Sequence, residues 1–499
     1  MKQNTITFLG LCLLTTSLFS CKKFLDEPIL GKYVSSNYFT SDANAVNAVN
    51  AAYVPLLFTD AGSNTIWVLG DVASDDAIKG GNPGDQADFE LVDQFNILPN
   101  NSAVEAEWKR NYDGIFRCNV VLDGLTDNTD VTSTVVTSCI GQAKFLRAYY
   151  YFLLTNCYGN IPLHLKVETP EELQSPAIPQ AQIFAQIISD LKDAAAALPA
   201  SQTDAGISRP TKGSALGLLA KTYLFAGNFD SAAIAAQQVD ALGVYQLTPK
   251  YADNFNASTK NNSEAIFAVW HSTGQSPFQG NNLNQWFAPR SINGYGFFYP
   301  TQSLADNYEK SSASDTIDPR KSYTMAYDGN AYYDQAYNPS WSTTGYISKK
   351  HIQPLSEIPV NIKGDGTLNE EVIRYADILL VEAEALNEQG KGSEALVPLN
   401  KVRKRARESY LNDQSLPGYG AVPAGLLPDI TTTDQTQLRD IIRRERRSEL
   451  ALEFMRFFDL MRYGSSYATA ALSDKPNFNY NNNRFFPIPQ SERDTNKKL

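Results

Sequence analysis

Aromatic rings and side-chain amides are concentrated between residues 281 and 299, and a similar stretch follows at 332–341. A flat ring can cover the apolar C–H face of a sugar, while amides, carboxylates or arginine bond the sugar's hydroxyl groups. Each ring could instead hold a long loop against the core. The side chains in these stretches that are candidates for ligand contact are Trp286, Arg290, Tyr295, Tyr333 and Trp341.

The titratable residues carry no recognisable catalytic or metal-binding pattern. A glycosidase needs two placed carboxylates, and no local signature selects a pair among the 54 Asp and Glu residues. The histidines, His164, His271 and His351, are isolated and lack the spacing of metal ligands. Gly-x-Ser-x-Gly and Walker-type loops are absent from the sequence. The sequence therefore predicts a binding protein without catalytic residues, metal or cofactor, and a lipid-anchored glycosidase is the enzymatic alternative.

The amino-terminal residues have the pattern of an exported lipoprotein. Lys2 precedes an apolar run that is too short to cross a bilayer as a helix, which needs about 20 residues. The run ends in Leu18-Phe19-Ser20-Cys21, where the signal should be cut. Acyl chains on the Cys21 sulfur would anchor the protein, because each buried CH₂ contributes about 0.8 kcal/mol. We expect a signal peptide over 1–20, then a lipidated Cys21 and a tether to residue 40. An ordinary cleaved signal is the alternative.

The composition is that of a soluble globular protein with an acidic balance. The 499 residues carry a net charge of −11, which becomes −12 once Lys2 leaves with the signal. Basic clusters at 401–405 and 443–447 alternate with apolar residues at helix spacing, so we expect them on solvated or ion-paired helix faces. No basic stripe with interleaved aromatic residues occurs, and nucleic acid is therefore not an expected partner.

Three cysteines remain in the mature chain: Cys118, Cys139 and Cys157. An odd number excludes a complete disulfide framework. Cys139 and Cys157 share one predicted helix, in which their separation would be about 27 Å, so these two cannot form a disulfide. A Cys118–Cys139 disulfide stays open, because antiparallel helices could bring the two residues together. Buried free thiols are the alternative.

Helical periodicity dominates the segments that must position the candidate residues. Apolar residues recur at helix spacing over 104–124 and 133–158, and the second segment is apolar nearly all round, which predicts a buried helix. An Ala–Gly–Ala spacing occurs twice within helix-period sequence, at 220, 227 and 232 and again at 383, 390 and 395. Tetratricopeptide helix pairs have such a spacing, with small residues where the helices cross and glycine in the turn.

Residues 251–364 differ from the rest, because they are rich in Asn, Gly, Ser and aromatic residues. The apolar stretch at 264–270 predicts a strand. The remainder should form long ordered loops, which usually carry function on a rigid scaffold. Core packing is expected for three tryptophans beside helix- or strand-period residues: Trp67, Trp108 and Trp270. Structural ion pairing is expected for the most conspicuous charged residues: Arg147, Arg209, Glu445, Arg447 and Asp459.

Several short blocks, taken in order, are similar to the SusD/RagB family of outer-membrane nutrient-binding lipoproteins, and the resemblance covers essentially the whole chain. The blocks start at Cys21-Lys22-Lys23-Phe24-Leu25-Asp26 and continue at 143–148, 158–163, 209–213, 373–380, 399–403, 445–451, 456–460 and 486–489. Two positions depart from the family pattern. Phe454 stands where the family usually has glycine, and Tyr463 stands where it usually has tryptophan.

The resemblance implies a mainly α fold, in which a scaffold of tetratricopeptide-like helix pairs carries an irregular, loop-rich ligand-binding lobe and a few short strands. We divide the chain after the tether into a helical half over 41–250, the loop-rich lobe over 251–364 and a second helical half over 365–499.

The resemblance also implies a function. The expected ligand is a glycan, the partner a TonB-dependent, SusC-like transporter, and the location the surface of the cell outer membrane. In the family, ligand also meets the loop after the first acidic segment, which here contains Asp75, Asp76 and Asn82. Some relatives carry peptide cargo, so a peptide- or protein-binding lipoprotein is a second alternative.

Overall fold

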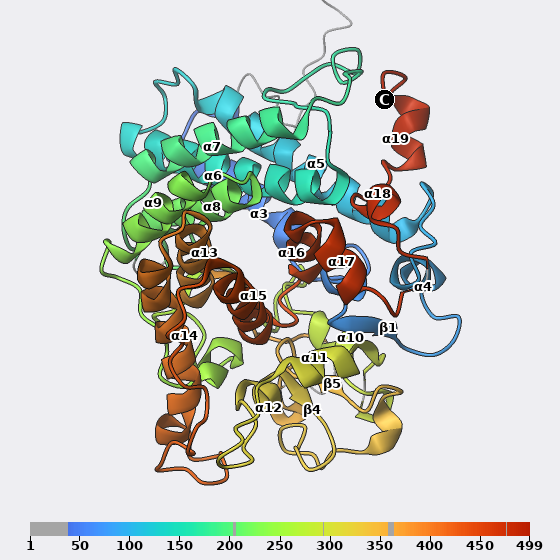
Figure 1. Cartoon of the computed structure of the whole chain (residues 1–499). Coiled ribbons are helices and arrows are strands. Elements are labelled where there is room, and N and C mark those ends of the chain that lie inside the picture. The colour runs from blue at the N-terminus through green and yellow to red at the C-terminus, as the bar shows by residue number, and fades with distance from the viewer. Residues whose placement is uncertain (1–37, 203–205, 293, 358–363, 476) are drawn as a thin grey trace, which may run out of the picture.

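The computed structural model is mostly helical, with a layered group of long helices above a lobe of short elements (Figure 1). Within the part of the chain that is described, no helix is both long enough and apolar enough to cross a membrane. The predicted signal, Cys21 and most of the tether lie outside the described residues, which are 38–499 without 203–205, 293, 358–363 and 476.

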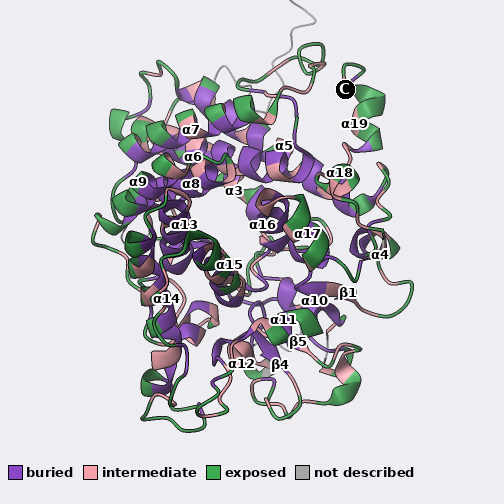
Figure 2. Cartoon of the chain, in the orientation of Figure 1, coloured by how far each residue is buried: buried purple, intermediate pink, exposed green. Residues whose placement is uncertain are grey.

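The long helices of the first half pack one on the next, from α5 through α9. The predicted helices at 104–124 and 133–158 are confirmed as α5 and α6, and α6 is buried along most of its length. Figure 2 shows α6 and α8 mostly buried, while α7 and α9 have exposed faces. The helices of this half are α3 (Asp42–Tyr53), α5 (Ser102–Leu125), α6 (Ser133–Tyr158), α7 (Gln180–Ala197), α8 (Lys212–Phe225) and α9 (Phe229–Asp240).

Both predicted helix pairs are confirmed. The first is α8 with α9, and the second is α13 (Tyr375–Glu388) with α14 (Gly392–Asn412). Gly227 and Gly390 make the turns with φ of +72° and +74°, a left-handed conformation that side chains disfavour. Helix α13 also packs on α9 and on α15 (Gln435–Leu450), so the second pair continues the stack of the first.

The remaining elements are short, and the strands in the described part of the chain form three two-stranded antiparallel sheets, β1–β3, β2–β6 and β4–β5. The strand predicted at 264–270 is confirmed as β2. The strands are β1 (Ala77–Gly80), β2 (Ala265–Val269), β3 (Phe297–Pro300), β4 (Met325–Ala326), β5 (Ile347–Ser348) and β6 (Glu370–Arg374). The short helices are η3 (Val54–Leu56), η4 (Val68–Val72), α4 (Ala87–Asp93), η6 (Tyr251–Phe255), α10 (Leu283–Phe287), η7 (Arg290–Ile292), α11 (Gln302–Asn307), α12 (Arg320–Thr324), η8 (Pro339–Trp341), η9 (Leu355–Glu357), α16 (Arg456–Tyr463), α17 (Ser465–Ala471), α18 (Tyr480–Asn483) and α19 (Gln490–Thr495).

The cysteines and two of the three tryptophans belong to the core. Cys118, Cys139 and Cys157 are buried free thiols, so the Cys118–Cys139 disulfide is not formed. Trp67 and Trp108 are 0% and 2% exposed, as expected. The expectation for Trp270 is wrong. This residue follows the last residue of β2 and is only partly buried, because the paired strand has already ended.

A buried network of ion pairs joins elements from distant parts of the chain. Its centre is Glu449 of α15, which pairs with Arg374 of β6 at 2.6 Å, with Arg320 of α12 at 2.9 Å and with Arg405 of α14. Glu264, just before β2, pairs with Arg374 at 2.8 Å and with Arg405 at 2.7 Å. Burial by itself raises the pKa of Glu449, but Arg405, Arg374 and Arg320 together hold that pKa well below its usual range.

Structural ion pairing is confirmed for four of the five residues for which it was expected. Their partners are Asp190 for Arg147, Arg320 and Arg403 for Glu445, Asp75 and Asp76 for Arg447, and Arg446 and Arg462 for Asp459. Arg209 differs, because its guanidinium bonds the amides of Asn50 and Gln142 and lies 5.0 Å from the centroid of the Tyr53 ring.

Replacing Arg374 with methionine should destabilise the fold by about 3–5 kcal/mol, because Glu449 and Glu264 would lose a partner while staying buried. The matched control is Arg117→Met, which breaks an exposed pair with Asp113 and should cost no more than about 1 kcal/mol. Urea unfolding at neutral pH measures both changes.

The loss of unfolding free energy caused by Arg374→Met should also depend on pH. The arginines lower the pKa of Glu449 in the folded state, so the stability that its charge provides is complete above the pKa of an unfolded glutamate, about 4.3. That stability is lost as the pH falls from there toward the folded-state pKa. A difference between wild type and variant that stayed constant from neutral pH to about pH 3 would contradict this account.

Candidate ligand-binding surface beside the first sheet

The β1–β3 sheet ends in two turns that require glycine. Gly80, Gly81 and Gly296 have φ of +70°, +70° and +72°. The N–H of Gly81 donates to the carbonyl of Gly296 at 2.5 Å, and a Cβ on Gly80 would lie 2.7 Å from the same oxygen. The close approach of the two backbones therefore fixes how the turns lie relative to one another.

Charged and polar candidates meet across these turns. The backbone N–H of Asn82 donates to the carboxylate of Asp85 at 2.9 Å, and Asp85 also forms a salt bridge with Arg290. Asn82 and Arg290 are exposed. Asp85 was not among the predicted site residues, because the sequence gives no sign that it meets a residue 205 positions away.

Tyr295 supplies an exposed ring next to this polar group. It is 40% exposed, and its ring packs edge-on against Trp286 with centroids 5.8 Å apart. Tyr299 of β3 lies beside the same turn, because a Cβ on Gly296 would lie 2.8 Å from its hydroxyl oxygen and 3.5 Å from Cγ of Arg290. Burial raises the pKa of Tyr299, and the charge of Arg290 opposes that rise.

Trp341 and Tyr333 occupy the adjoining loop. Trp341 is partly buried, with its ring centroid 5.8 Å from that of Tyr332 and 5.9 Å from that of Tyr337. The Tyr333 hydroxyl lies 2.5 Å from the Lys349 carbonyl and 2.7 Å from the Ile352 carbonyl. The polar end of Tyr333 therefore holds its loop together, and the expectation that it faces ligand is not supported by its contacts.

Trp286 is a core residue. It is 6% exposed, stacks on Phe89 with centroids 6.2 Å apart and lies 5.1 Å from the ring of Phe297 and 6.0 Å from that of Trp67. The expectation that Trp286 offers an exposed platform is wrong. Its ring is covered by aromatic residues from β3 and from the distant segment 67–89, so it supports Tyr295 from below.

Asp75 and Asp76 are also structural. They are 2% and 1% exposed, and the expectation that they contact ligand is wrong. Arg456 pairs with Asp75 at 2.8 Å, and Arg447 pairs with Asp76 at 2.7 Å. Burial raises the pKa of Asp75, but Arg456 and Arg447 hold that pKa below its usual value. Buried carboxylates need such partners, and this pair fixes the start of β1.

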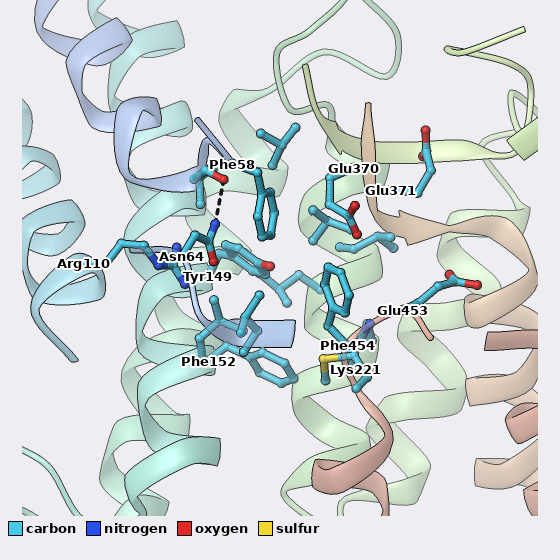
Figure 3. A pocket seen from close by; sticks show the side chains of 18 residues that line it. Phe58, Asn64, Arg110, Tyr149, Phe152, Lys221, Glu370, Glu371, Glu453 and Phe454 are labelled. Carbon is cyan, nitrogen blue, oxygen red and sulfur yellow. Dashed lines mark hydrogen bonds between the residues drawn. The ribbon is translucent and has the colours of Figure 1, made fainter. Parts of the chain in front are cut away.

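A small cavity elsewhere in the protein does not resemble a sugar site. Its volume is about 40 Å³, room for two or three water molecules. Figure 3 shows it between Asn64 and Arg110 on one side and Glu370, Glu371 and Phe454 on the other. Among the described residues, Oδ1 of Asn64, Nε of Arg110 and Oε2 of Glu371 have no hydrogen-bond partner, so the cavity suits internal water.

Two family models match the chain. The model described as "SusD family" matches residues 263–499, and one described as "Starch-binding associating with outer membrane" matches residues 33–224. SusD-like protein P2 of Formosa agariphila is 28% identical, over all of this chain and 99% of its own length.

Solved structures share the fold. A laminarin-binding SusD-like protein is 30% identical, with a TM-score of 0.75 over 91% of this chain and 97% of its own. Surface glycan-binding protein A of Bacteroides thetaiotaomicron, solved with laminarihexaose, is 23% identical, with a TM-score of 0.76 over 92% and 98% of the two chains, and shows the fold alone. The helix-pair scaffold with its loop-rich lobe is thus shared with a laminarin-binding SusD-like protein. The chain belongs to the SusD family.

Trp286→Ala should lower the free energy of unfolding by about 3–5 kcal/mol, because a buried indole would leave a cavity among packed rings. Tyr295→Ala, which removes a neighbouring exposed ring, should change stability far less. Thermal and urea unfolding of the two variants measure this difference. Equal stability of the two variants would mean that Trp286 is not held in the core.

Proposed function

We propose that this protein binds glycans at the cell surface and that the turns beside the β1–β3 sheet are where a sugar chain is held. The observation that carries the proposal is the exposed Tyr295 ring beside the Asn82, Asp85 and Arg290 cluster. The ring offers a face for the C–H side of a pyranose, and the neighbouring side chains offer both donors and acceptors for its hydroxyl groups.

The ligand class proposed first is a β-glucan. The 30% identical relative is a laminarin-binding protein, and the two proteins share the fold over nearly their whole lengths. The candidate surface is open, so it suits an internal segment of a long chain. We further propose that binding occurs without catalysis, because the sequence carries no recognisable catalytic pattern.

The proposed surroundings are the outer membrane and a transporter. Acyl chains on Cys21 would hold the protein at the surface. Capture becomes uptake only if the sugar is handed on, and the proposed recipient is a TonB-dependent, SusC-like barrel. Association with the outer membrane is part of the description of one matching family.

Tyr295→Ala should weaken binding of laminarin oligosaccharides by up to about tenfold, since stacking on an exposed ring is worth on the order of 0.5–1.5 kcal/mol. Arg290→Ala should weaken it as well. Isothermal titration measures affinity, and thermal unfolding should show unchanged midpoints. The control is Tyr419→Ala, because Tyr419 is 47% exposed and lies on a loop outside this surface.

Other results would favour the alternatives. Cleavage of labelled oligosaccharides by the purified protein would favour a lipid-anchored glycosidase. A glycan array without hits, together with measurable peptide binding, would favour a peptide- or protein-binding lipoprotein. Unchanged affinity in both the Tyr295 and Arg290 variants would move the glycan site away from these turns.

The two proposed attachments to the membrane can be separated by one variant. Cys21→Ser should lose its lipid anchor, so it should remain with outer membranes only in cells that contain the barrel. Wild-type protein should remain there with or without the barrel, and gentle detergent should release it together with the barrel. Release of the wild type alone would contradict the partnership, and retention of Cys21→Ser without the barrel would contradict the anchor.

A further inference from the structure

A second cleft, with a volume of about 210 Å³, lies where the first helical half meets strand β2. Its floor is strand β2, one wall is formed by residues 200–202 and 207–211 after α7, and the other by Val244 and Tyr245 after α9. Trp270 lines it where the chain leaves β2. We call it the Trp270 cleft, and it shares no lining residue with the surface beside the β1–β3 sheet.

The walls of the Trp270 cleft are held by specific contacts. The Tyr245 hydroxyl lies 2.8 Å from Oγ1 of Thr211, which caps helix α8 together with Ser214. A Cβ on Gly213 would lie 2.2 Å from the Tyr245 hydroxyl, so glycine leaves the room that the ring needs. The Ser214 hydroxyl donates to the carbonyl of Ile266 at 2.7 Å and ties the cap to the floor. The cleft is therefore formed before any ligand arrives.

Lys260 lies beside the Trp270 ring. Nζ of Lys260 lies 6.0 Å from the centroid of the Trp270 ring and donates to the carbonyl of Thr367 at 2.8 Å. Two more apolar side chains at the cleft are exposed, Ile207 at 48% and Val244 at 42%. A partly exposed indole flanked by aliphatic groups offers an apolar surface that water covers poorly.

Polar groups with spare bonding capacity lie beside this apolar surface. Asn261 accepts from Asn369 through Oδ1, and within the described residues its Nδ2 has no partner. Gln202 donates to the Pro210 carbonyl at 3.3 Å, and no described residue bonds its side-chain oxygen. Among the described residues that line the cleft none is acidic, and Arg209 is the one that carries a charge. The cleft thus combines a ring with amide donors and acceptors, as sugar recognition requires.

We propose that the Trp270 cleft is a second carbohydrate-binding site, which holds one or two rings of a sugar chain. The volume is below the roughly 300–1,000 Å³ of pockets that bury drug-sized ligands, so most of the chain stays in solvent. One pyranose stacks on Trp270, and its hydroxyl groups bond Asn261 and Gln202. The inference rests on the proposed function for the class of ligand. It adds a second point of attachment. A polysaccharide that occupies both sites at once binds more tightly than it would at either site alone.

Titration of the protein with laminarihexaose, and in parallel with maltohexaose and oligogalacturonate, tests this site. At least one of these sugars should bind with two sites per chain. Trp270→Ala should bind sugar only at the surface beside the β1–β3 sheet, and Tyr295→Ala should bind it only in the Trp270 cleft. The double variant should bind at neither site. Gels that contain the matching polysaccharide should retard each single variant less than wild type. The apparent affinity of each single variant should be about tenfold weaker, because one of the two attachments is lost.

Two controls show whether a loss of binding in Trp270→Ala comes from misfolding. Trp270→Phe keeps a flat ring and should retain most of the second-site binding. The thermal midpoint of Trp270→Ala should equal that of the control Tyr419→Ala. The inference is overturned if wild type binds every sugar with one Tyr295-dependent site and Trp270→Ala matches it. If no sugar binds wild type at all, the proposed function fails first, and this inference fails with it.

Discussion

The buried charges at the centre of the second half are the constraint on which the rest of the fold depends. Glu449 and Glu264 are fully buried, and three arginines from β6, α12 and α14 reach them. Burying any one of these ions alone would cost several kcal/mol, so the set is tolerable only when all its members are in place. The network therefore joins elements from residue 264 to residue 449 into one body, and it gives the short strands a fixed base.

Buried ion pairs also fix the position of the candidate surface. Arg447 lies two residues before Glu449 on α15, and with Arg456 it holds the acidic pair at Asp75 and Asp76. That pair immediately precedes β1, whose far end carries the turn with Asn82. The aromatic cluster around Trp286 supports the opposite turn. The exposed side chains on these turns are thus supported by two buried clusters. One consists of the ion pairs at Asp75 and Asp76, and the other of the aromatic rings around Trp286.

The scaffold could be predicted from the sequence because its signals are local. Helix-period apolar residues marked α5 and α6, and the repeated Ala–Gly–Ala spacing marked both helix pairs. The site could be predicted only in part. Trp286 and Tyr295 lie in the same aromatic stretch, and what separates them is coverage by Trp67 and Phe89, about 200 residues upstream. Asp85 was missed and Trp270 was misjudged for a related reason, since a long-range contact and the end of strand pairing leave no local pattern.

The turn at Phe454 carries a consequence for how the molecule assembles. Phe454 has φ of +64°, and a Cβ on Gly70 would lie 1.9 Å from its carbonyl oxygen, so two backbones pass in direct contact. The carboxylate of Asp71 accepts from the N–H groups of Phe454 and Arg456 at 2.8 and 3.1 Å. These partners are more than 380 residues apart in the chain. Contacts between residues so far apart in the chain form slowly. The base of the turns beside the β1–β3 sheet is therefore completed late in folding, once almost the whole chain is available.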